Sequence, residues 1–370
     1  MTDRSDIYKK FADRKKGFPP LTEYKILSTK ETGGVPVEIR QMTEQLERQT
    51  LSPRARLAAE SRGRLIDIAP CPMRTCFQRD IDRVVHCKSF RRLKHKTQVF
   101  LQPEGDHYRT RMTHTLEVAR IARTMARGLR LNEDLTEAAA LAHDLGHTPF
   151  GHAGERALSR VVDGGFVHAK QSLRVVDRLE YDGAGLNLCH EVRQGILCHS
   201  HGPIADTLEG QLVRYADKIA YINHDIDDAM RGGIIFPTDI PVHISQVLGY
   251  THSERISTLT ADIVENSQEG EVIRQSETVG KAMAELRAFM FQSVYLNPKA
   301  KGEEGKAEDM VCQLFDYYMN HTDKLPGEYQ DILVREGAQR AVVDYIAGMT
   351  DTYAVEKFSS LFIPMRWMVK

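Results

Sequence analysis

The sequence has few cysteines and no long apolar run. Six cysteines in 370 residues are too few for a disulfide-stapled fold, and no paired CxxC motif supports a structural zinc site. No stretch approaches the run of about 18 apolar residues that a membrane helix needs. The first 20 residues, MTDRSDIYKKFADRKKGFPP, are charged throughout and lack the apolar core of a signal peptide. We therefore expect a cytoplasmic protein with reduced thiols and no membrane segment.

An excess of charge of either sign is also missing. The chain has 50 lysines and arginines against 51 aspartates and glutamates, which gives a net charge of -1. This balance argues against a protein that holds nucleic acid mainly by bulk electrostatics. Apolar residues make up 41% and charged residues 27% of the chain. That composition excludes a disordered chain and fits one large domain or two smaller ones.

Histidine, by contrast, is abundant and concentrated in one part of the chain. Eleven of the 15 histidines lie between positions 86 and 201, more than twice the share that an even spread would place there. Clustered histidines are typical of metal or proton chemistry, although composition alone does not separate this from polar surface.

The apolar pattern is mostly helical from about residue 80 onward. In 114–129, apolar residues recur every three or four positions. Further helices are expected over 50–64, 135–145, 153–162, 172–180, 191–199, 208–230, 254–295, 306–320, 327–347 and 353–361. Strand-like stretches are short and are confined to 35–39, 97–101 and 234–236. The sequence therefore predicts an all-α fold with a small β element and additional C-terminal helices.

Four residues have the character of metal ligands. His114 lies on the apolar face of the 114–129 helix, and His143 and Asp144 are adjacent at the end of an Ala-rich helix. Asp217 lies beside an apolar face of the 208–230 helix. A lone core histidine usually only forms a hydrogen bond, but imidazoles buried together with carboxylates call for a cation. This donor set suits one divalent ion of the Mg, Mn, Fe, Co, Ni or Zn group.

The same residues carry a resemblance to a known family. His114, then His143-Asp144, then Asp217 match the H…HD…D pattern of the HD-domain metal-dependent phosphohydrolases. Longer blocks resemble the deoxyguanosine triphosphate triphosphohydrolase (dGTPase) branch of that superfamily. They are RDIDRVVHCKSFRRLKHKTQVF (79–100), RTRMTHTLEVARIAR (109–123), HDLGHTPFGHAGE (143–155), FVHAKQSLRVVDRLE (166–180), LEGQLVRYADKIAYINHDIDDAM (208–230) and DYIAGMTDTYA (344–354). Residues 1–60 and 250–330 show only faint resemblance.

The resemblance implies a domain plan and an activity. An N-terminal extension, 1–60, would be partly irregular, 61–250 would form the HD catalytic domain, and the helical C-terminal region, 251–370, would pack on it. The implied reaction is hydrolysis of a deoxynucleoside triphosphate, dGTP or several dNTPs, to the deoxynucleoside and inorganic triphosphate. The family often forms hexamers, so a homo-oligomer is implied. A nucleotide or single-stranded DNA effector is left open.

The resemblance also implies roles for the residues that match its motifs. His114, His143, Asp144 and Asp217 would hold the metal. His152 would protonate the departing 5′-oxygen with Glu155 as its partner, because a carboxylate orients an imidazole and raises its pKa. His147 would lie near the phosphates or the attacking water.

Six further residues are expected to bind the substrate. Arg111 would clamp phosphate by its planar guanidinium, and His168 would either contact phosphate or support a residue that does. On the 208–230 helix, Lys218 would bind the triphosphate, Tyr221 would pack on the sugar and Asp225 would hold the 3′-hydroxyl. Gln98 would be a further sugar or base contact. Asp227 and Asp228 are better explained as a solvated acidic face.

Two alternatives remain open from the sequence. The first is another HD phosphohydrolase, of the cyclic-nucleotide or ppGpp phosphodiesterase type, some of which hold two metals; His147, His168 and His199 could serve a second ion. The second is a non-enzymatic nucleotide- or nucleic-acid-binding regulator on the HD scaffold. Every matched metal position is intact, which argues against the latter.

Overall fold

The computed structural model describes residues 38–98, 109–200, 202–297 and 302–364. The chain divides into two units, Met1–Glu38 and Ile39–Lys370, and all the helices described below belong to the second. None of the described helices has the length and apolarity of a membrane-spanning segment. The helices between residues 39 and 231 are α2 (Ile39–Thr50), α3 (Cys76–Val85), α4 (Lys88–Arg92), α5 (Arg111–Gly128), α6 (Glu133–Ala142), α7 (Gly151–Val161), α8 (His168–Arg174), α9 (His190–Cys198) and α10 (Leu208–Arg231). The later helices are α11 (Val242–Leu248), α12 (His252–Asn266), α13 (Glu277–Met290), α15 (Glu304–Asn320), α16 (Gly327–Glu336), α17 (Ala338–Ala347) and α18 (Asp351–Phe362).

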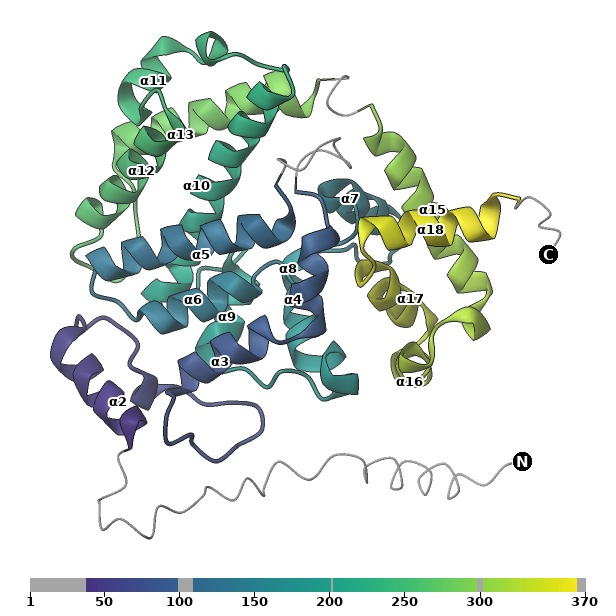
Figure 1. Ribbon diagram of the computed structural model, residues 1–370, viewed down its shortest axis with the longest axis horizontal. Coiled ribbons are helices and arrows are strands. Elements are labelled where there is room, and N and C mark those ends of the chain that lie inside the picture. Colours follow the sequence, from purple (N-terminus) through teal and green to yellow (C-terminus); the bar gives the residue numbers. More distant parts are fainter. Residues whose placement is uncertain (1–37, 99–108, 201, 298–301, 365–370) are drawn as a thin grey trace, which may run out of the picture. The chain divides into compact units, whose positions relative to one another are not determined.

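The first hydrophobic core lies among α5, α6, α9 and α10, which pack on one another (Figure 1). Local sequence signals define these helices. Thr110 caps α5 by accepting from the Thr113 N–H, and Asn132 caps α6 by accepting from the Leu135 N–H. The inward faces are apolar and fully buried, with Val118, Ala122, Met125, Ala138, Leu212, Ala216 and Ile219 among their residues. Three of these helices, α5, α6 and α10, carry or lead directly into the expected metal ligands.

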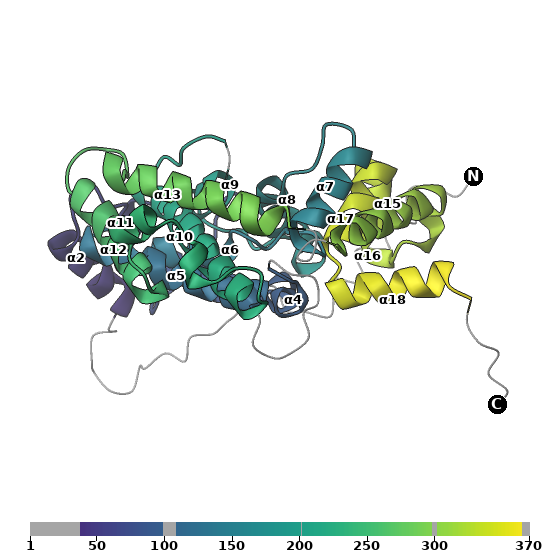
Figure 2. The same cartoon turned by 90° about the horizontal axis from the view of Figure 1, so that it is seen from above.

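A second core joins α7 to the C-terminal helices. Leu158 of α7 is buried in one cluster with Leu314 of α15 and Ile346 of α17. Figures 1 and 2 both show α15, α16, α17 and α18 grouped together, with α7 beside them. The segment that follows His143-Asp144 is therefore packed between the first core and the C-terminal helices.

The prediction of an all-α fold is confirmed, but the prediction of a small β element was wrong, because isolated bridges take its place in the described residues. The described ranges contain no strand, and only two isolated bridges pair Arg64 with Cys189 and Thr97 with Thr110. Of the expected strands, 234–236 has no strand partner because the Ile234 N–H instead closes the end of α10 by donating to the Ala229 carbonyl. Residues 35–37 and 99–101 lie outside the described residues, and Ile39 begins α2.

The helix expected over 50–64 was also wrong. Backbone N–H groups in this segment bond to distant side chains: the Arg56 N–H donates to Glu209 and the Ala58 N–H to Glu47. Pro53 has no N–H to contribute to a helix. Only Ala58–Glu60 makes a short 3₁₀ turn, and the amphipathic helix of this region is α2, one segment earlier.

Glu209, in the first turn of α10, gives the fold a pH dependence. One of its carboxylate oxygens accepts the backbone N–H groups of Arg56 and Asn132, at 2.9 and 3.0 Å. No donor among the described residues reaches the other oxygen, which is buried. Burial therefore outweighs the hydrogen bonds and raises the pKa of Glu209 from 4.5 to about 7. Since the folded state binds this proton more tightly, the contribution of Glu209 to stability is fully present below pH 4.5 and falls by about 3 kcal/mol as the pH rises from 4.5 to about 7.

Glu209→Gln is expected to remove that dependence. The amide keeps the oxygen that accepts both N–H groups and carries no charge to bury. The urea midpoint at pH 8 should rise relative to the unchanged protein, whereas at pH 4.5 the two should agree. Glu191→Gln is the control, because Glu191 is equally buried but both of its oxygens are hydrogen-bonded, to Ser61 and Arg62. A Glu209→Gln protein with the original fall in stability between pH 4.5 and 8 would contradict the assignment.

Candidate metal and phosphate site

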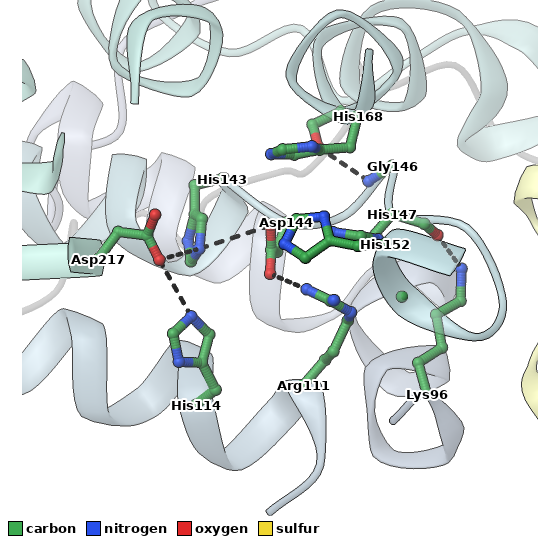
Figure 3. Close-up of polar contacts among 12 residues, drawn as sticks. Lys96, Arg111, His114, His143, Asp144, Gly146, His147, His152, His168 and Asp217 are labelled. Atoms are coloured by element: carbon green, nitrogen blue, oxygen red, sulfur yellow. Dashed lines mark hydrogen bonds and ion pairs between the residues drawn. The ribbon is translucent and has the colours of Figure 1, made fainter. Parts of the chain in front are cut away.

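Three helices bring the four expected metal ligands to one point (Figure 3). His114 comes from the first turn of α5, His143 and Asp144 follow the end of α6, and Asp217 comes from α10. His114 Nε2 lies 3.1 Å from Asp217 Oδ1, and His143 Nε2 lies 3.6 Å from Asp144 Oδ1 and 3.8 Å from Asp217 Oδ1. The ligand atoms of His114, His143 and Asp144 all lie within 4.8 Å of one another. The four side chains thus point at a common centre.

The hydrogen bonds of His143 show that this centre suits a cation. His143 Nδ1 lies 2.6 Å from the Ala140 carbonyl and donates to it, so Nε2 is the ring nitrogen left to bind a ligand. That atom is buried, and no hydrogen-bond partner reaches it within the described residues. Instead it faces the two carboxylates, which can only accept when ionised. A metal ion among these groups would give the buried Nε2 a partner and offset the charge of the two carboxylates. The donor set of two imidazoles and two carboxylates fits such an ion.

The other ring nitrogen of His114, Nδ1, takes part in a chain of contacts through His224 to Glu117. His114 Nδ1 lies 3.3 Å from His224 Nδ1, and His224 Nε2 lies 2.9 Å from a Glu117 oxygen. If His114 keeps Nε2 for the metal, its Nδ1–H donates to His224, which in turn donates to Glu117. Such outer contacts fix the tautomer and raise the basicity of a ligand histidine.

Arg111, in the first turn of α5, joins the metal ligands to an anion site. Its NH1 donates to Asp144 Oδ2 at 2.6 Å. Burial raises the pKa of Asp144, but His143 and Arg111 outweigh it and hold that pKa well below its ordinary value. The buried Nε and NH2 of Arg111 have no acceptor in the described part of the chain. Two free donors of a planar fork, beside a candidate metal, match the oxygens of a phosphate.

The loop after the HD pair is shaped by glycine and ends in a left-handed residue. A Cβ on Gly146 would lie 2.1 Å from the Ser172 nitrogen, so only glycine lets the loop approach α8. Phe150 has φ 62° and Gly151 has φ 58°, and α7 begins there. This turn places His147 inside the site and His152 and Glu155 at the start of α7, as the sequence placed them. Burial and the nearby Arg111 lower the pKa of His147 well below its ordinary value.

Glu155 connects two of the expected histidines. It accepts from His152 Nδ1 at 3.2 Å and faces His168 Nδ1 at 3.0 Å. Burial raises its pKa, but the hydrogen bonds from His152 and His168 outweigh this and lower it. The side chain of His152 is 69% exposed, so its Nε2 is open to a ligand.

His168 is held as a cation. Its Nδ1 faces the Glu155 carboxylate, and its Nε2 lies 3.1 Å from Nε2 of His199. His199 donates through Nδ1 to the Ile196 carbonyl, and burial with the nearby His143 and His168 lowers its pKa to about 3. Its Nε2 is therefore an acceptor, and His168 must donate from both nitrogens. Burial opposes this charge, but Glu155 overcomes it and raises the pKa of His168.

The remaining expected contacts come from the loop beside this centre and from α10. Gln98 lies beside the loop, because a Cβ added to Gly151 would lie 3.6 Å from the backbone carbonyl oxygen of Gln98. The same Cβ would lie 3.0 Å from Arg111 NH2. Lys218, Tyr221 and Asp225 continue along α10 from Asp217. They form a second group, linked to the first through that helix. Burial and the nearby Asp225 raise the pKa of Tyr221 to about 12, against the opposing charge of Arg287.

Several residues of the site were missed from the sequence. Tyr295 donates its hydroxyl to Asp225, His199 and His224 contact the expected histidines, and Lys96 donates to the His147 carbonyl. Tyr295 lies outside the blocks that carry the resemblance, and its contact joins segments 70 residues apart. His199 had been noted only as a ligand for a second metal. Nothing in its spacing indicates a pairing with His168.

Comparison with known proteins gives one family match that contains the site and a second that follows it in the chain. Residues 111–222 match the HD domain, and residues 273–360 match the phosphohydrolase-associated domain. Three similar proteins are each named deoxyguanosinetriphosphate triphosphohydrolase-like protein. The one from Caldanaerobacter subterraneus subsp. tengcongensis is 55% identical over 90% of this chain and 98% of its own length. Those from Desulfatibacillum aliphaticivorans and Clostridium perfringens are 49% and 47% identical over 88% and 89% of this chain, and both are covered over 98% of their length.

Proposed function

This chain belongs to the deoxyguanosinetriphosphate triphosphohydrolase-like family of HD-domain proteins, and on that premise we propose that it hydrolyses a deoxynucleoside triphosphate to the deoxynucleoside and inorganic triphosphate. The observation that carries the proposal is the pairing of two unsatisfied groups. Within the described residues, the buried His143 Nε2 faces two carboxylates without a hydrogen-bond partner, and two donor nitrogens of Arg111 have no acceptor beside Asp144. The first group calls for a metal ion and the second for a phosphate.

We propose that His114, His143, Asp144 and Asp217 hold one divalent ion per chain, of the Mg, Mn, Fe, Co, Ni or Zn group. Such an ion neutralises phosphate charge and makes water a better nucleophile. The contacts of His168 favour a single ion over a pair, because both of its nitrogens already donate to Glu155 and His199. Metal analysis of the purified protein distinguishes one ion from two, and thereby tests the two-metal phosphodiesterase alternative.

The side chains of this protein then divide the work on the α-phosphate. Arg111 donates its free N–H groups to phosphate oxygens, and the charged His168 adds a second cation close to Asp144. Water attacks phosphorus as the bond to the 5′-oxygen breaks. His152 donates a proton from Nε2 to that oxygen, while Glu155 holds its Nδ1–H. His147 lies between these groups, with its ring stacked on that of His168.

The second group on α10 is proposed to bind the rest of the substrate. Lys218 would contact the triphosphate, Tyr221 would pack against the sugar at C2′, and Asp225 would accept the 3′-hydroxyl. Gln98 would contact the sugar or the base. A tyrosine packed against C2′ leaves no space for a 2′-hydroxyl, which gives a preference for deoxynucleotides. Tyr295 orients Asp225 in this arrangement.

The proposal is tested by product analysis. The purified protein is incubated with each dNTP alone and with all four mixed, in Mg²⁺ or Mn²⁺ and in ¹⁸O-water. We expect inorganic triphosphate carrying the label and unlabelled deoxynucleoside, because water attacks phosphorus. Pyrophosphate with a deoxynucleoside monophosphate would overturn the proposal. Turnover of cyclic nucleotides or ppGpp, with none of any dNTP, would favour the other HD phosphohydrolases.

We also propose that the protein acts in the cytoplasm as a homo-oligomer, and that its turnover responds to a nucleotide or single-stranded DNA effector. Light scattering gives the oligomeric state in solution. Repeating the assay with a second nucleotide or a single-stranded oligonucleotide tests the effector, because an effector changes the rate without being consumed.

A further inference from the structure

The end of α17 and the start of α18 contact two segments that carry histidines of the site. These contacts come from DYIAGMTD, residues 344–351, which lies about 200 residues after the HD pair in the chain. Its two aspartates, Asp344 and Asp351, are buried and are surrounded by donors from the catalytic half. Neither aspartate belongs to the metal ligands or to the proposed substrate contacts.

Asp351 holds the loop that leads to His152. Its Oδ1 accepts the Phe150 N–H at 2.9 Å, and its Oδ2 accepts the Thr97 N–H at 2.8 Å as well as the Thr97 hydroxyl. Phe150 is in the left-handed region, with φ 62°, which a residue with a side chain keeps only when its surroundings fix it. Because α7 starts at the next residue, the orientation of His152 depends on this turn.

Lys96 ties the same loop to α17. Its buried amino group donates to the His147 carbonyl and, at 2.8 Å, to the Ala347 carbonyl at the end of α17. Figure 3 shows Lys96 pointing at the backbone of His147, on the side away from the metal ligands. The loop is thus bonded to the C-terminal helices at both His147 and Phe150.

Asp344 holds α8, which begins with His168. Its carboxylate accepts from Gln171 Nε2 at 2.8 Å and from Arg174 Nε at 2.8 Å, and it has no exposed surface. The same helix receives the loop, since Ser172 Oγ accepts the Gly146 N–H at 2.9 Å. The two aspartates therefore fix the two elements that present His147, His152 and His168.

We propose that Asp351 and Asp344 are positioning residues of the active site, and that the phosphohydrolase-associated region completes the site by fixing the 146–151 loop and α8. The effect of the two aspartates on turnover rests on the function proposed above. Their effect on the loop does not, because the order of the loop can be measured without a substrate.

The test is Asp351→Asn, followed by hydrogen exchange and kinetics. Phe150 and Thr97 donate to different carboxylate oxygens, so an asparagine keeps an acceptor for only one of them and its amide group must face the other. We expect amide exchange in residues 144–152 to rise about tenfold, which reports local opening of this loop. We expect kcat to fall about 100-fold, since a displacement near 1 Å has this effect on a positioned group. KM and the bound metal should stay within a factor of about two, because the contacts to phosphate and metal are retained.

Asp262→Asn is the matched control. Asp262 is also buried and accepts a backbone N–H, that of Ser276, at 3.0 Å, but it contacts none of the site residues. It should leave both the loop exchange and kcat unchanged. Lys96→Met is the second variant, in case Asp351→Asn is too unstable to purify; it removes the bond to His147 while keeping side-chain length, and should also raise loop exchange. For Asp344→Asn, amide exchange should increase in residues 168–174 and not in the loop.

The outcomes separate the two proposals. A folded Asp351→Asn or Lys96→Met protein with unchanged loop exchange overturns the inference. So does increased exchange with an unchanged kcat, because the loop would then not position the reacting groups. If the unchanged protein hydrolyses no dNTP, the proposed function fails, and the exchange data still decide whether Asp351 orders the loop.

Discussion

Asp217→Asn is expected to leave a folded protein that binds no metal and has almost no turnover. The asparagine has the shape of the aspartate, and its amide can donate to the His114 Nε2 lone pair, which lies 3.1 Å from an Asp217 oxygen. The fold should therefore survive without the ion. Turnover should fall about 1000-fold or more, because a catalytic metal supplies about 4 kcal/mol and each 1.4 kcal/mol is a factor of ten.

The measurement combines metal analysis, circular dichroism and triphosphate release. Asp227→Asn is the control on the same helix, since Asp227 pairs with Arg109 and not with a metal ligand. The solvated face expected for Asp227 and Asp228 was wrong for Asp228, which is buried against the same arginine. Asp227→Asn should keep the metal and most of the activity. An Asp217→Asn protein that retains one metal ion and normal turnover would show that Asp217 is not a ligand.

Most helices of the catalytic half could be predicted because their signals are local. The three- and four-residue apolar spacing of 114–129 and the Gly232-Gly233 end of α10 act within one segment. The segment 50–64 has similar local signals, but its backbone N–H groups bond to Glu47 and Glu209. No spacing in the sequence reveals that a carboxylate 153 residues away replaces helical hydrogen bonds.

The site residues divide in the same way, into those with a local sequence signal and those fixed by distant contacts. Burying imidazoles and carboxylates costs free energy in any fold. His143 and Asp144, at the end of an Ala-rich helix, could therefore be recognised from the sequence alone. Their partners could not: His199 is a neutral acceptor only because of the Ile196 carbonyl, and it thereby forces the charge on His168. Asp351 was read only as part of a C-terminal block. Its role depends on the left-handed turn at Phe150, which is visible only in three dimensions.

His152→Gln is expected to remove the proton donor while leaving the binding site in place. The side chain is 69% exposed and its hydrogen bond is to Glu155, so its replacement should change stability little. Loss of a positioned general acid lowers the rate by about 100- to 10,000-fold. The fall should appear in kcat, because neither Arg111 nor the four metal ligands contact this side chain through a hydrogen bond given by the structure.

His243→Gln provides the matched control for this variant. His243 is 65% exposed on α11 and hydrogen-bonded to Glu285 at 3.0 Å, a pair of the same kind away from the site. Its loss should leave kcat unchanged, which separates the chemistry of His152 from any general effect of breaking an exposed His–Glu pair. Steady-state kinetics with metal analysis gives the comparison. If His152→Gln raises KM with kcat unchanged, His152 binds the substrate and does not protonate the leaving oxygen, and the proton must come from His147 or His168.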